Sequence, residues 1–221
     1  MTPVCLLVVA KAPVPGLAKT RLAATLGDTV AADIAAAALL DTLDAVAATA
    51  ADARVVAMTG DLAAAACFDE IRSRLQDFTV IPQRGDGFAD RLANAHLDAA
   101  AATGAQSVVQ IGMDTPQVTP ELLGDCVQAL STDDAVLGPA RDGGWWVLGV
   151  QDATTAACLR GVPMSAPDTG AVTLAALRDT GLSVGLVGEL TDVDTVDDID
   201  AVRRACPPGS RFCRITATVE A

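Results

Sequence analysis

Short apolar runs alternate with longer alanine-rich segments along the chain, and this alternation predicts a repeating order of strands and helices. The first run, residues 4–10, is continuously apolar, as expected for a strand that is covered on both faces. Further strands are predicted at residues 54–58, 79–82, 107–112, 135–139, 145–150 and 184–187. Helices are predicted at residues 19–51, with a break near Gly27, and at 62–75, 88–102, 119–130, 168–180 and 195–205. We expect Asp28 and Thr119 to act as helix N-caps.

The regular order changes at residues 135–150, where two strand-like segments are separated only by residues 140–144. So short a connection predicts an antiparallel hairpin, whereas the strand–helix–strand repeats elsewhere predict parallel pairing. The chain is therefore expected to have an α/β fold, a three-layer α/β/α sandwich with a mixed, mostly parallel sheet. We expect a single domain over residues 1–206 and a C-terminal tail over residues 207–221.

The charge balance limits the classes of partner. The 221 residues include 15 Lys+Arg and 28 Asp+Glu, which gives a formal net charge of −13. Nucleic acids and anionic membranes are bound by clustered basic residues, so neither is expected as a partner. The two lysines of the chain, Lys11 and Lys19, nevertheless lie eight positions apart in one loop. This placement indicates a site for a small anion.

Cysteine spacing and apolar run lengths bear on the compartment. The six cysteines are scattered without a CxxC motif, and His96 has no partner at a zinc-ligand spacing, so a zinc site is not predicted. Scattered thiols are typical of a reducing cytosol. Residues 4–10 are too few to span a bilayer and lack the preceding charges of a signal peptide. We expect a cytoplasmic protein with no membrane span.

The loop after the first strand is the strongest candidate for a phosphate site. Pro15 and Gly16 fix its shape, and Lys11, Lys19 and Arg21 place three cations within eleven residues. A helix that begins after the loop would add free N–H groups, which favour a bound phosphate. The alternative is an ordinary surface loop, but the confinement of lysine to this segment favours anion binding.

Two aspartate segments also follow predicted strands. Asp114 lies directly after the strand at 107–112, where ligands of α/β sheets gather, and the alternative is that it caps the next helix. Asp192 and Asp194 alternate on an extended segment and should point the same way, which suits Mg²⁺ or Mn²⁺. Part of this second cluster is expected to be structural, because Thr195 and Asp198 have the spacing of a capping box.

Two loops supply weaker candidates. In the predicted hairpin turn, Gly143 and Gly144 would allow a ligand to approach the backbone, and Asp142 and Trp145 would lie beside it. Trp145 and Trp146 are adjacent on a strand, so one should pack in the core while the other lines the cleft. A plain hairpin turn with two core tryptophans explains the glycines equally well. Gln83, in a polar loop, could contact a nucleobase or simply be solvated.

Taken together, these segments resemble a known family. The motifs Ala-Lys-x-Pro-x-Pro-Gly-x-x-Lys-Thr-Arg-Leu (10–22), Ile-Gly-x-Asp-x-Pro (111–116), Gly-Pro-Ala-x-Asp-Gly-Gly-Trp-Trp (138–146) and Asp-Val-Asp-Thr (192–195) resemble those of bacterial glycosyltransferase-A-type proteins, the radical-SAM/selenodomain-associated transferase 1 family. The chain is also similar to phospholactate guanylyltransferase and to the molybdenum-cofactor nucleotidyltransferases. The resemblance extends to about residue 205. It departs from the family pattern at Trp145, Trp146 and Met164, where tyrosines and a tryptophan are expected, and at Ala89-Asp90, where Gly-Glu is usual.

The resemblance implies a nucleotide-diphospho-sugar transferase fold with a divalent metal, Mg²⁺ or Mn²⁺. Lys19 and Arg21 would then bind nucleotide phosphates, Asp114 and Asp194 would coordinate the metal, and Asp142 would lie on the acceptor side.

Two transferase reactions fit these site residues, because in both of them the cations would stabilise charge on a leaving phosphate. The residues themselves do not separate the two, but the family resemblance favours a glycosyltransferase that acts on a nucleotide sugar and a small-molecule acceptor, with Lys19, Asp114 and Asp142 as the catalytic residues. The alternative is a nucleotidyltransferase that releases pyrophosphate from a nucleoside triphosphate. A nucleotide-binding protein without turnover and a purely structural α/β domain are further hypotheses. The sequence carries no sign of the oligomeric state.

Overall fold

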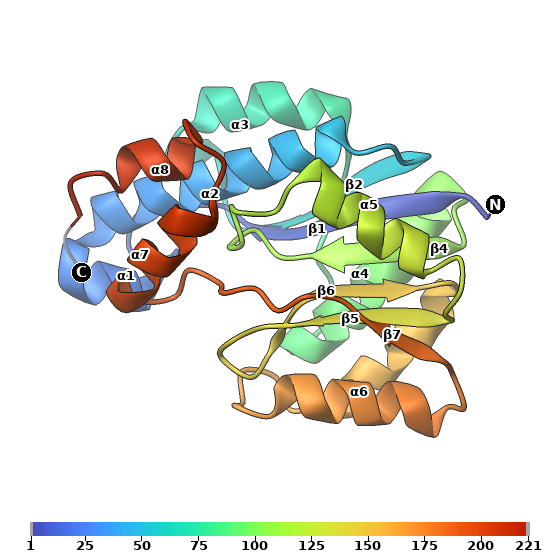
Figure 1. Ribbon diagram of the computed structural model, residues 1–221. Helices are drawn as coiled ribbons and strands as arrows, with labels where there is room; N and C mark the ends of the chain where they lie inside the picture. The colour runs from blue at the N-terminus through green and yellow to red at the C-terminus, as the bar shows by residue number, and fades with distance from the viewer. Residues whose placement is uncertain (1, 220–221) are drawn as a thin grey trace.

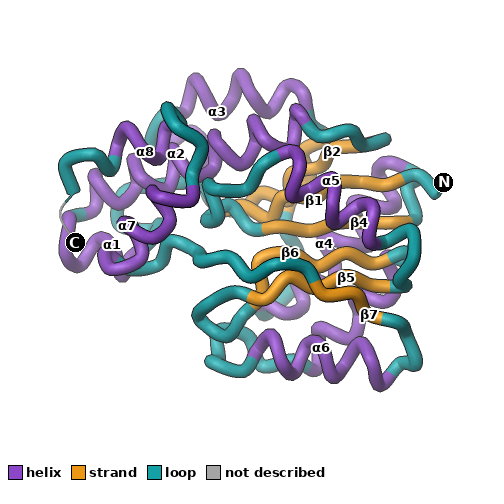
Figure 2. Tube along the Cα trace, in the orientation of Figure 1, coloured by secondary structure: helices purple, strands orange, loops and turns teal. Residues whose placement is uncertain are grey.

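A seven-stranded sheet forms the centre of the protein, of which the computed structural model describes residues 2–219 (Figures 1 and 2). The order of its strands is β3-β2-β1-β4-β6-β5-β7. Their bounds are β1 (Val4–Lys11), β2 (Ala53–Thr59), β3 (Thr79–Pro82), β4 (Ser107–Ile111), β5 (Ala135–Pro139), β6 (Trp145–Val150) and β7 (Val184–Leu186). β6 is antiparallel to both β4 and β5, whereas all other neighbours are parallel. The mixed, mostly parallel sheet and its hairpin are therefore confirmed.

Helices cover both faces of the sheet. Alternate residues of β1 point in opposite directions, so that Leu6 joins a core cluster with Leu39, whereas Leu7 joins a second cluster with Leu92. The first cluster lies under α2 (Asp28–Ala48), α3 (Phe68–Arg74) and α5 (Pro120–Ala129). The second lies under α4 (Phe88–Thr103), a 3₁₀ segment (Ala153–Gly161) and α6 (Thr169–Asp179). In Figure 1, α5 lies in front of the sheet and α4 behind it. The predicted three-layer sandwich is confirmed.

The remaining helices gather at one end of the sheet. They are α1 (Thr20–Leu26), α7 (Val196–Ala205) and α8 (Arg211–Ile215), and they lie beside α2 in Figure 1. Thr195 and Asp198 form the predicted capping box of α7, and the Thr119 hydroxyl accepts a hydrogen bond from the N–H of Leu122 at the start of α5. Among residues 2–219, no helix has the length and apolar character that a membrane span requires.

Two predicted helix boundaries are wrong. Asp28 is not the N-cap of α2 but its first residue, because Gly27, with φ of 85°, forms the junction with α1. An acidic residue in the first turn still interacts favourably with the helix dipole. The helix expected over residues 62–75 is interrupted, since Leu62–Ala64 is a 3₁₀ turn and α3 starts only after Cys67, whose φ is 54°. Leu75–Asp77 forms a second 3₁₀ turn.

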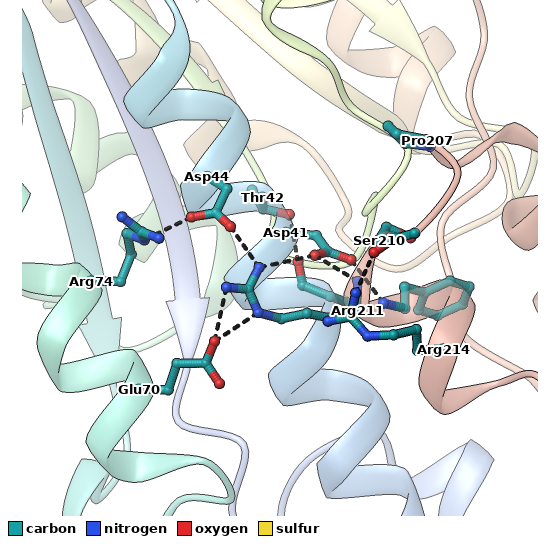
Figure 3. A network of polar contacts seen from close by, with 12 residues as sticks. Asp41, Thr42, Asp44, Glu70, Arg74, Pro207, Ser210, Arg211 and Arg214 are labelled. Atoms are coloured by element: carbon teal, nitrogen blue, oxygen red, sulfur yellow. Dashed lines mark hydrogen bonds and ion pairs between the residues drawn. The ribbon is translucent and has the colours of Figure 1, made fainter.

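The segment expected to be a C-terminal tail is packed against the rest of the chain over its described residues. Phe212 of α8 is fully buried in a third core cluster, together with Leu22 and Ile199. Figure 3 shows Arg211 bound to carboxylates of α2 and α3, at 2.5 Å from Asp44 Oδ2. Its other partners are Asp41, at 3.3 Å, and Glu70, at 2.8 Å. Within residues 207–219, Phe212 and Thr216 are buried and the other residues are exposed or half-buried, so the segment is anchored to the core through α8, whereas residues 220–221 lie outside the described part.

Replacing Arg211 by methionine is expected to lower the free energy of unfolding by about 2 kcal/mol. The arginine side chain is only partly exposed, so its loss leaves the carboxylates of Asp41 and Glu70 without a counter-charge, while Asp44 keeps only its ion pair with Arg74. Urea titration of the variant measures the effect. Arg214→Met is the matched control on the same helix, because Arg214 bonds only to the carbonyl of Gly209 among the described residues. Equal losses in the two variants would contradict the prediction.

Candidate functional site

A cavity of about 800 Å³ opens at the carboxyl ends of β1 and β4. The strand order reverses here, since β2 and β3 lie on one side of β1 and β4 on the other, and such reversal points are where α/β sheets bind ligands. All five segments that the sequence analysis singled out contribute to its wall. The predicted site residues that line it are Lys11, Lys19, Arg21, Gln83, Asp114, Asp142, Gly144, Trp145 and Asp194. Pro15, Gly16 and Gly143 are not part of the lining.

The β1–α1 loop places Lys19 at the floor of this cavity. Gly16, with φ of 76°, turns the loop back, and Lys19 itself adopts φ of 46° just before α1. The side chain is 14% exposed, and its Nζ lies 2.9 Å from Asp114 Oδ2 and 3.8 Å from Asp194 Oδ1. Burial opposes the charged form, but the carboxylates of Asp114 and Asp194 outweigh it and raise the pKa of Lys19 above its usual value. The loop lysine and both predicted metal ligands are thus brought together.

The segment from β7 to α7 is tied to the loop that carries Asp114. The N–H of Val193 donates to the carbonyl of Asp114 at 2.9 Å, and the Val193 side chain is buried. Because neighbouring residues of an extended segment point in opposite directions, Asp192 and Asp194 both face the cavity. Arg21 Nη1 forms an ion pair with Asp194. The expected common orientation of these two aspartates is confirmed.

Aspartates gather at this point of the cavity. Burial, together with the nearby charges of Asp114 and Asp142, raises the pKa of Asp192 to about 6. Four carboxylates, those of Asp114, Asp142, Asp192 and Asp194, line the cavity, but within residues 2–219 only two of its cations, Lys19 and Arg21, form ion pairs with any of them. A divalent cation would add positive charge beside these aspartates.

The donor set fits Mg²⁺ or Mn²⁺ when a ligand supplies further oxygens. Asp114 and Asp194 converge on a single point, now held by Lys19 Nζ, and both offer hard oxygen ligands. Within residues 2–219, no three His, Cys, Asp or Glu side chains are close enough to hold an ion by themselves. Mg²⁺ is commonly bound by one or two carboxylates together with substrate phosphates, and this arrangement suits that mode.

The outer part of the β1–α1 loop holds Lys11. Its Nζ donates to the carbonyl of Leu17 at 2.6 Å, and its side chain is exposed at the cavity wall. Pro15 and Gly16 are exposed and shape the loop from outside the cavity. These residues therefore shape the loop that carries Lys11 and Lys19.

The β5–β6 turn combines a structural and a cavity-facing role. Asp142 Oδ1 accepts the N–H of Gly144 at 2.8 Å, which closes the turn. Gly143 is needed for packing, because a Cβ there would lie 1.9 Å from the carbonyl oxygen of Pro167. The two tryptophans pack on opposite faces of the sheet, as expected. Trp146 is buried and donates to the carbonyl of Gly188 at 2.8 Å, Trp145 is half-buried, and both line the cavity.

Gly143→Ala is expected to cost about 3 kcal/mol of folding free energy. The glycine has φ of 91°, and an added methyl group would collide with backbone that cannot move aside. Gly161→Ala is the matched control, since a Cβ at that position meets no heavy atom within 4 Å. Urea unfolding of both variants would measure the difference, and a Gly143→Ala protein as stable as the control would refute the steric argument.

The contacts of Gln83 differ from the predicted ones, which were with a nucleobase or with solvent. Its Nε2 donates to the carbonyls of Ala10 and Ala57, at 2.8 and 2.9 Å, and so joins the ends of β1 and β2. Both amide hydrogens are thereby engaged, and only its Oε1 remains to accept from a ligand. The side chain still lines the cavity, but its clearest role is to hold two strand ends together.

Several cavity residues were not among the predicted site residues, and two of them are polar residues of β4 and α4. Gln110, at 1% exposure, and Arg91 of α4 both line the wall. Gln110 lies within a buried, mostly apolar strand, and its polar side chain was the feature of the sequence that could have indicated a site residue. Arg91 lies in a helix whose pattern gives no sign of which face meets the cavity. Asp192 also belongs to the site, and its alternation with Asp194 was the signal that places it there.

Comparisons with known proteins bear on this site. Residues 42–166 match the model of a family described as "Uncharacterized protein conserved in bacteria (DUF2064)". The chain belongs to this DUF2064 family. A search of curated proteins found no significant match.

Solved structures similar to this DUF2064 protein are transferases or share their fold. A protein of Desulfovibrio desulfuricans G20, described as a candidate nucleotide-diphospho-sugar transferase, is 27% identical with a TM-score of 0.83, over 99% of this chain and 97% of that one. The 4-diphosphocytidyl-2C-methyl-D-erythritol synthase of Anaerococcus prevotii DSM 20548 is 14% identical with a TM-score of 0.61, over 91% and 94%. Rv0371C of Mycobacterium tuberculosis H37Rv, solved as a manganese complex, is 20% identical with a TM-score of 0.55, over 91% and 98%. These neighbours confirm the fold class and bear out the expectation of a transferase.

Proposed function

We propose that this protein is a metal-dependent transferase that takes its transferred group from a nucleotide sugar. The convergence of Asp114 and Asp194 on Lys19 Nζ, inside a cavity of about 800 Å³, carries the proposal. A cavity of this size is large enough for a nucleotide-sized ligand. The Desulfovibrio neighbour, described as a candidate nucleotide-diphospho-sugar transferase, supports this choice of donor. The six unpaired cysteines fit a reducing compartment, and we place the reaction in the cytoplasm.

Each site residue has a role in this reaction. Lys11, Lys19 and Arg21 would bind the donor phosphates and stabilise the charge that develops on the leaving phosphate. Asp114 and Asp194 would hold Mg²⁺ or Mn²⁺, which supplies further charge neutralisation when it is bound. Asp142 Oδ1 is occupied by the N–H of Gly144, so Oδ2 would accept the proton of an acceptor hydroxyl.

A nucleotidyl transfer is the second candidate. Three cations within eleven residues suit a triphosphate, whose charge exceeds that of a nucleotide sugar. In that reaction a phosphate of the acceptor would attack the α-phosphorus of the nucleotide, and the same cations would stabilise the leaving pyrophosphate. The Anaerococcus synthase, a structural neighbour at 14% identity, shows only that the fold is shared.

Thermal-shift and calorimetric titrations with nucleoside triphosphates and nucleotide sugars, each with Mg²⁺, Mn²⁺ or EDTA, test the proposal. Tighter binding of a UDP- or GDP-sugar with metal supports glycosyl transfer. Preference for a triphosphate, with pyrophosphate released on addition of a phosphorylated acceptor, selects nucleotidyl transfer. Absence of stabilisation by every nucleotide would overturn both.

Lys19→Met is expected to separate two effects of the lysine, namely its competition with a metal ion and its binding of nucleotide phosphates. The ammonium occupies the point between Asp114 and Asp194, so its removal should strengthen binding of Mn²⁺ alone by roughly tenfold. The same change should weaken binding of nucleotide phosphates by a comparable factor, because a cation is lost. Calorimetry with Mn²⁺ and with nucleotide, separately, measures both. Weaker Mn²⁺ binding by the variant would show that the two carboxylates do not form the metal site.

A further inference from the structure

Arg91 is a cation of the cavity that the proposed donor site does not use. It lies in the first turn of α4, where its guanidinium carbon is 5.7 Å from the centroid of the Phe88 ring. Its Nε is buried and has no hydrogen-bond partner among the described residues. Buried donors of charged groups are normally paired, so an unpaired one in a cavity wall indicates a missing ligand.

The other cations of the cavity already have partners. Lys19 pairs with Asp114, Arg21 pairs with Asp194, and Lys11 donates to the carbonyl of Leu17. By contrast, no carboxylate within residues 2–219 forms an ion pair with Arg91.

The arginines nearest to Arg91 are also paired. Arg84 binds both oxygens of Asp98 at 2.7 Å, and Asp90, which directly precedes Arg91, is taken by Arg160 at 2.6 Å. Arg91 is therefore the cation of the cavity lining whose side chain has no hydrogen-bond or ion-pair partner among residues 2–219.

The surroundings of Arg91 differ from those of Lys19. α4 covers the face of the sheet opposite to α2, and its residue Leu92 packs in the core cluster against which Trp145 and Met164 also lie. Trp145, Met164 and Phe88 line the cavity with Arg91, so this part of the wall is largely apolar and aromatic. An anionic group would meet a cation here without the aspartates that surround Lys19.

We propose that this part of the cavity is the acceptor subsite, and that the acceptor carries a negatively charged group, a phosphate or a carboxylate, bound by Arg91. The inference rests on the proposed function, because it assigns the Lys19 side of the cavity to the nucleotide donor. A guanidinium binds two oxygens of such a group in parallel, which fixes the orientation as well as the position of the acceptor. Trp145 and Phe88, which line the same cavity, supply apolar surface for the rest of the acceptor.

Three probes with one carbon skeleton test the proposal, namely glycerol 3-phosphate, glycerate and glycerol. Their affinities are measured by calorimetry on the full chain in the presence of Mn²⁺. We expect at least one charged probe to bind roughly tenfold or more tightly than glycerol, and the better of the two identifies the group as phosphate or carboxylate. Arg91→Gln should remove this preference, and Arg91→Lys, which keeps the charge but not the planar fork, should retain part of it.

Arg84→Gln is the matched control, because Arg84 belongs to the same region but binds Asp98 and does not line the cavity. It should bind all three probes as the wild type does. Wild-type protein that binds neither charged probe better than glycerol would overturn the proposal, as would an Arg91→Gln variant with unchanged preference. Nucleotide affinity, measured separately, should not change in Arg91→Gln, and its loss there would assign Arg91 to the donor side instead. Failure of the wild type to bind any nucleotide would remove the proposed function while leaving the probe comparison readable.

Discussion

Replacing Asp114 by asparagine is expected to lower turnover about 10³-fold, which corresponds to about 4 kcal/mol of transition-state stabilisation. Asp114 is one of two carboxylates that converge on the floor of the cavity, and the amide of asparagine is a neutral and weaker metal ligand. The variant should also lose the stabilisation that a nucleotide with Mn²⁺ gives to the wild type. Thermal shifts with nucleotide and either Mn²⁺ or EDTA measure this loss independently of any assay for turnover.

Two further variants are compared with Asp114→Asn, one at the second carboxylate and one outside the cavity. Asp194→Asn should behave as Asp114→Asn does, because both carboxylates face the same ammonium. Asp69→Asn should leave nucleotide binding unchanged, since Asp69 forms an exposed pair with Arg72 outside the cavity lining. If Asp114→Asn binds nucleotide with Mn²⁺ as tightly as the wild type, the metal is not held here and the proposed function is wrong.

The strands and helices could be predicted because each leaves a local pattern. The hairpin of β5 and β6 was visible in the short, glycine-containing connection between two apolar runs. The position of β6 between β4 and β5 could not be predicted. The central residues of β6 are buried on both faces, and a uniformly apolar strand does not indicate which strands lie next to it. The buried role of α8 was also missed, because it depends on Phe212 and on an ion-pair network with residues about 170 positions earlier.

The candidate site could be predicted from the sequence to about the same extent as the fold. Loops at the carboxyl ends of parallel strands meet at one edge, so the order of elements sufficed to bring Lys19, Asp114 and Asp194 together. What each side chain contacts depends on distances across the fold. The sequence gives no sign that Gln83 donates to two strand carbonyls, or that Asp142 closes its own turn. Sequence position thus identified the segments, whereas the partners of individual polar groups required the structure.

The buried histidine should control the stability of the fold at mildly acidic pH. His96 of α4 is fully buried, and neither ring nitrogen has a hydrogen-bond partner within residues 2–219. Burial lowers the pKa of His96 to about 3, and the nearby Gln110 side chain opposes this only weakly. An imidazole of the unfolded chain has a pKa near 6.5. The unfolded state therefore binds a proton that the folded state excludes, and stability is lost as the pH falls from about 6.5 toward 3.

The expected loss is about 2 kcal/mol between pH 7 and pH 5, and about 4 kcal/mol once the pH reaches 3. Urea unfolding at a series of pH values measures it in the wild type and in His96→Gln and His96→Leu, neither of which titrates at this position. His96 is the one histidine of the chain, so the difference between wild type and variants isolates its contribution. The raised pKa of Asp192 acts in the opposite direction, because its folded form takes up a proton first, but it is common to all three proteins and cancels in the difference. If the wild type and both variants lose stability in parallel between pH 7 and pH 5, then His96 accepts a proton in the folded state. The helix α4 would then have to admit water or a polar partner to the ring.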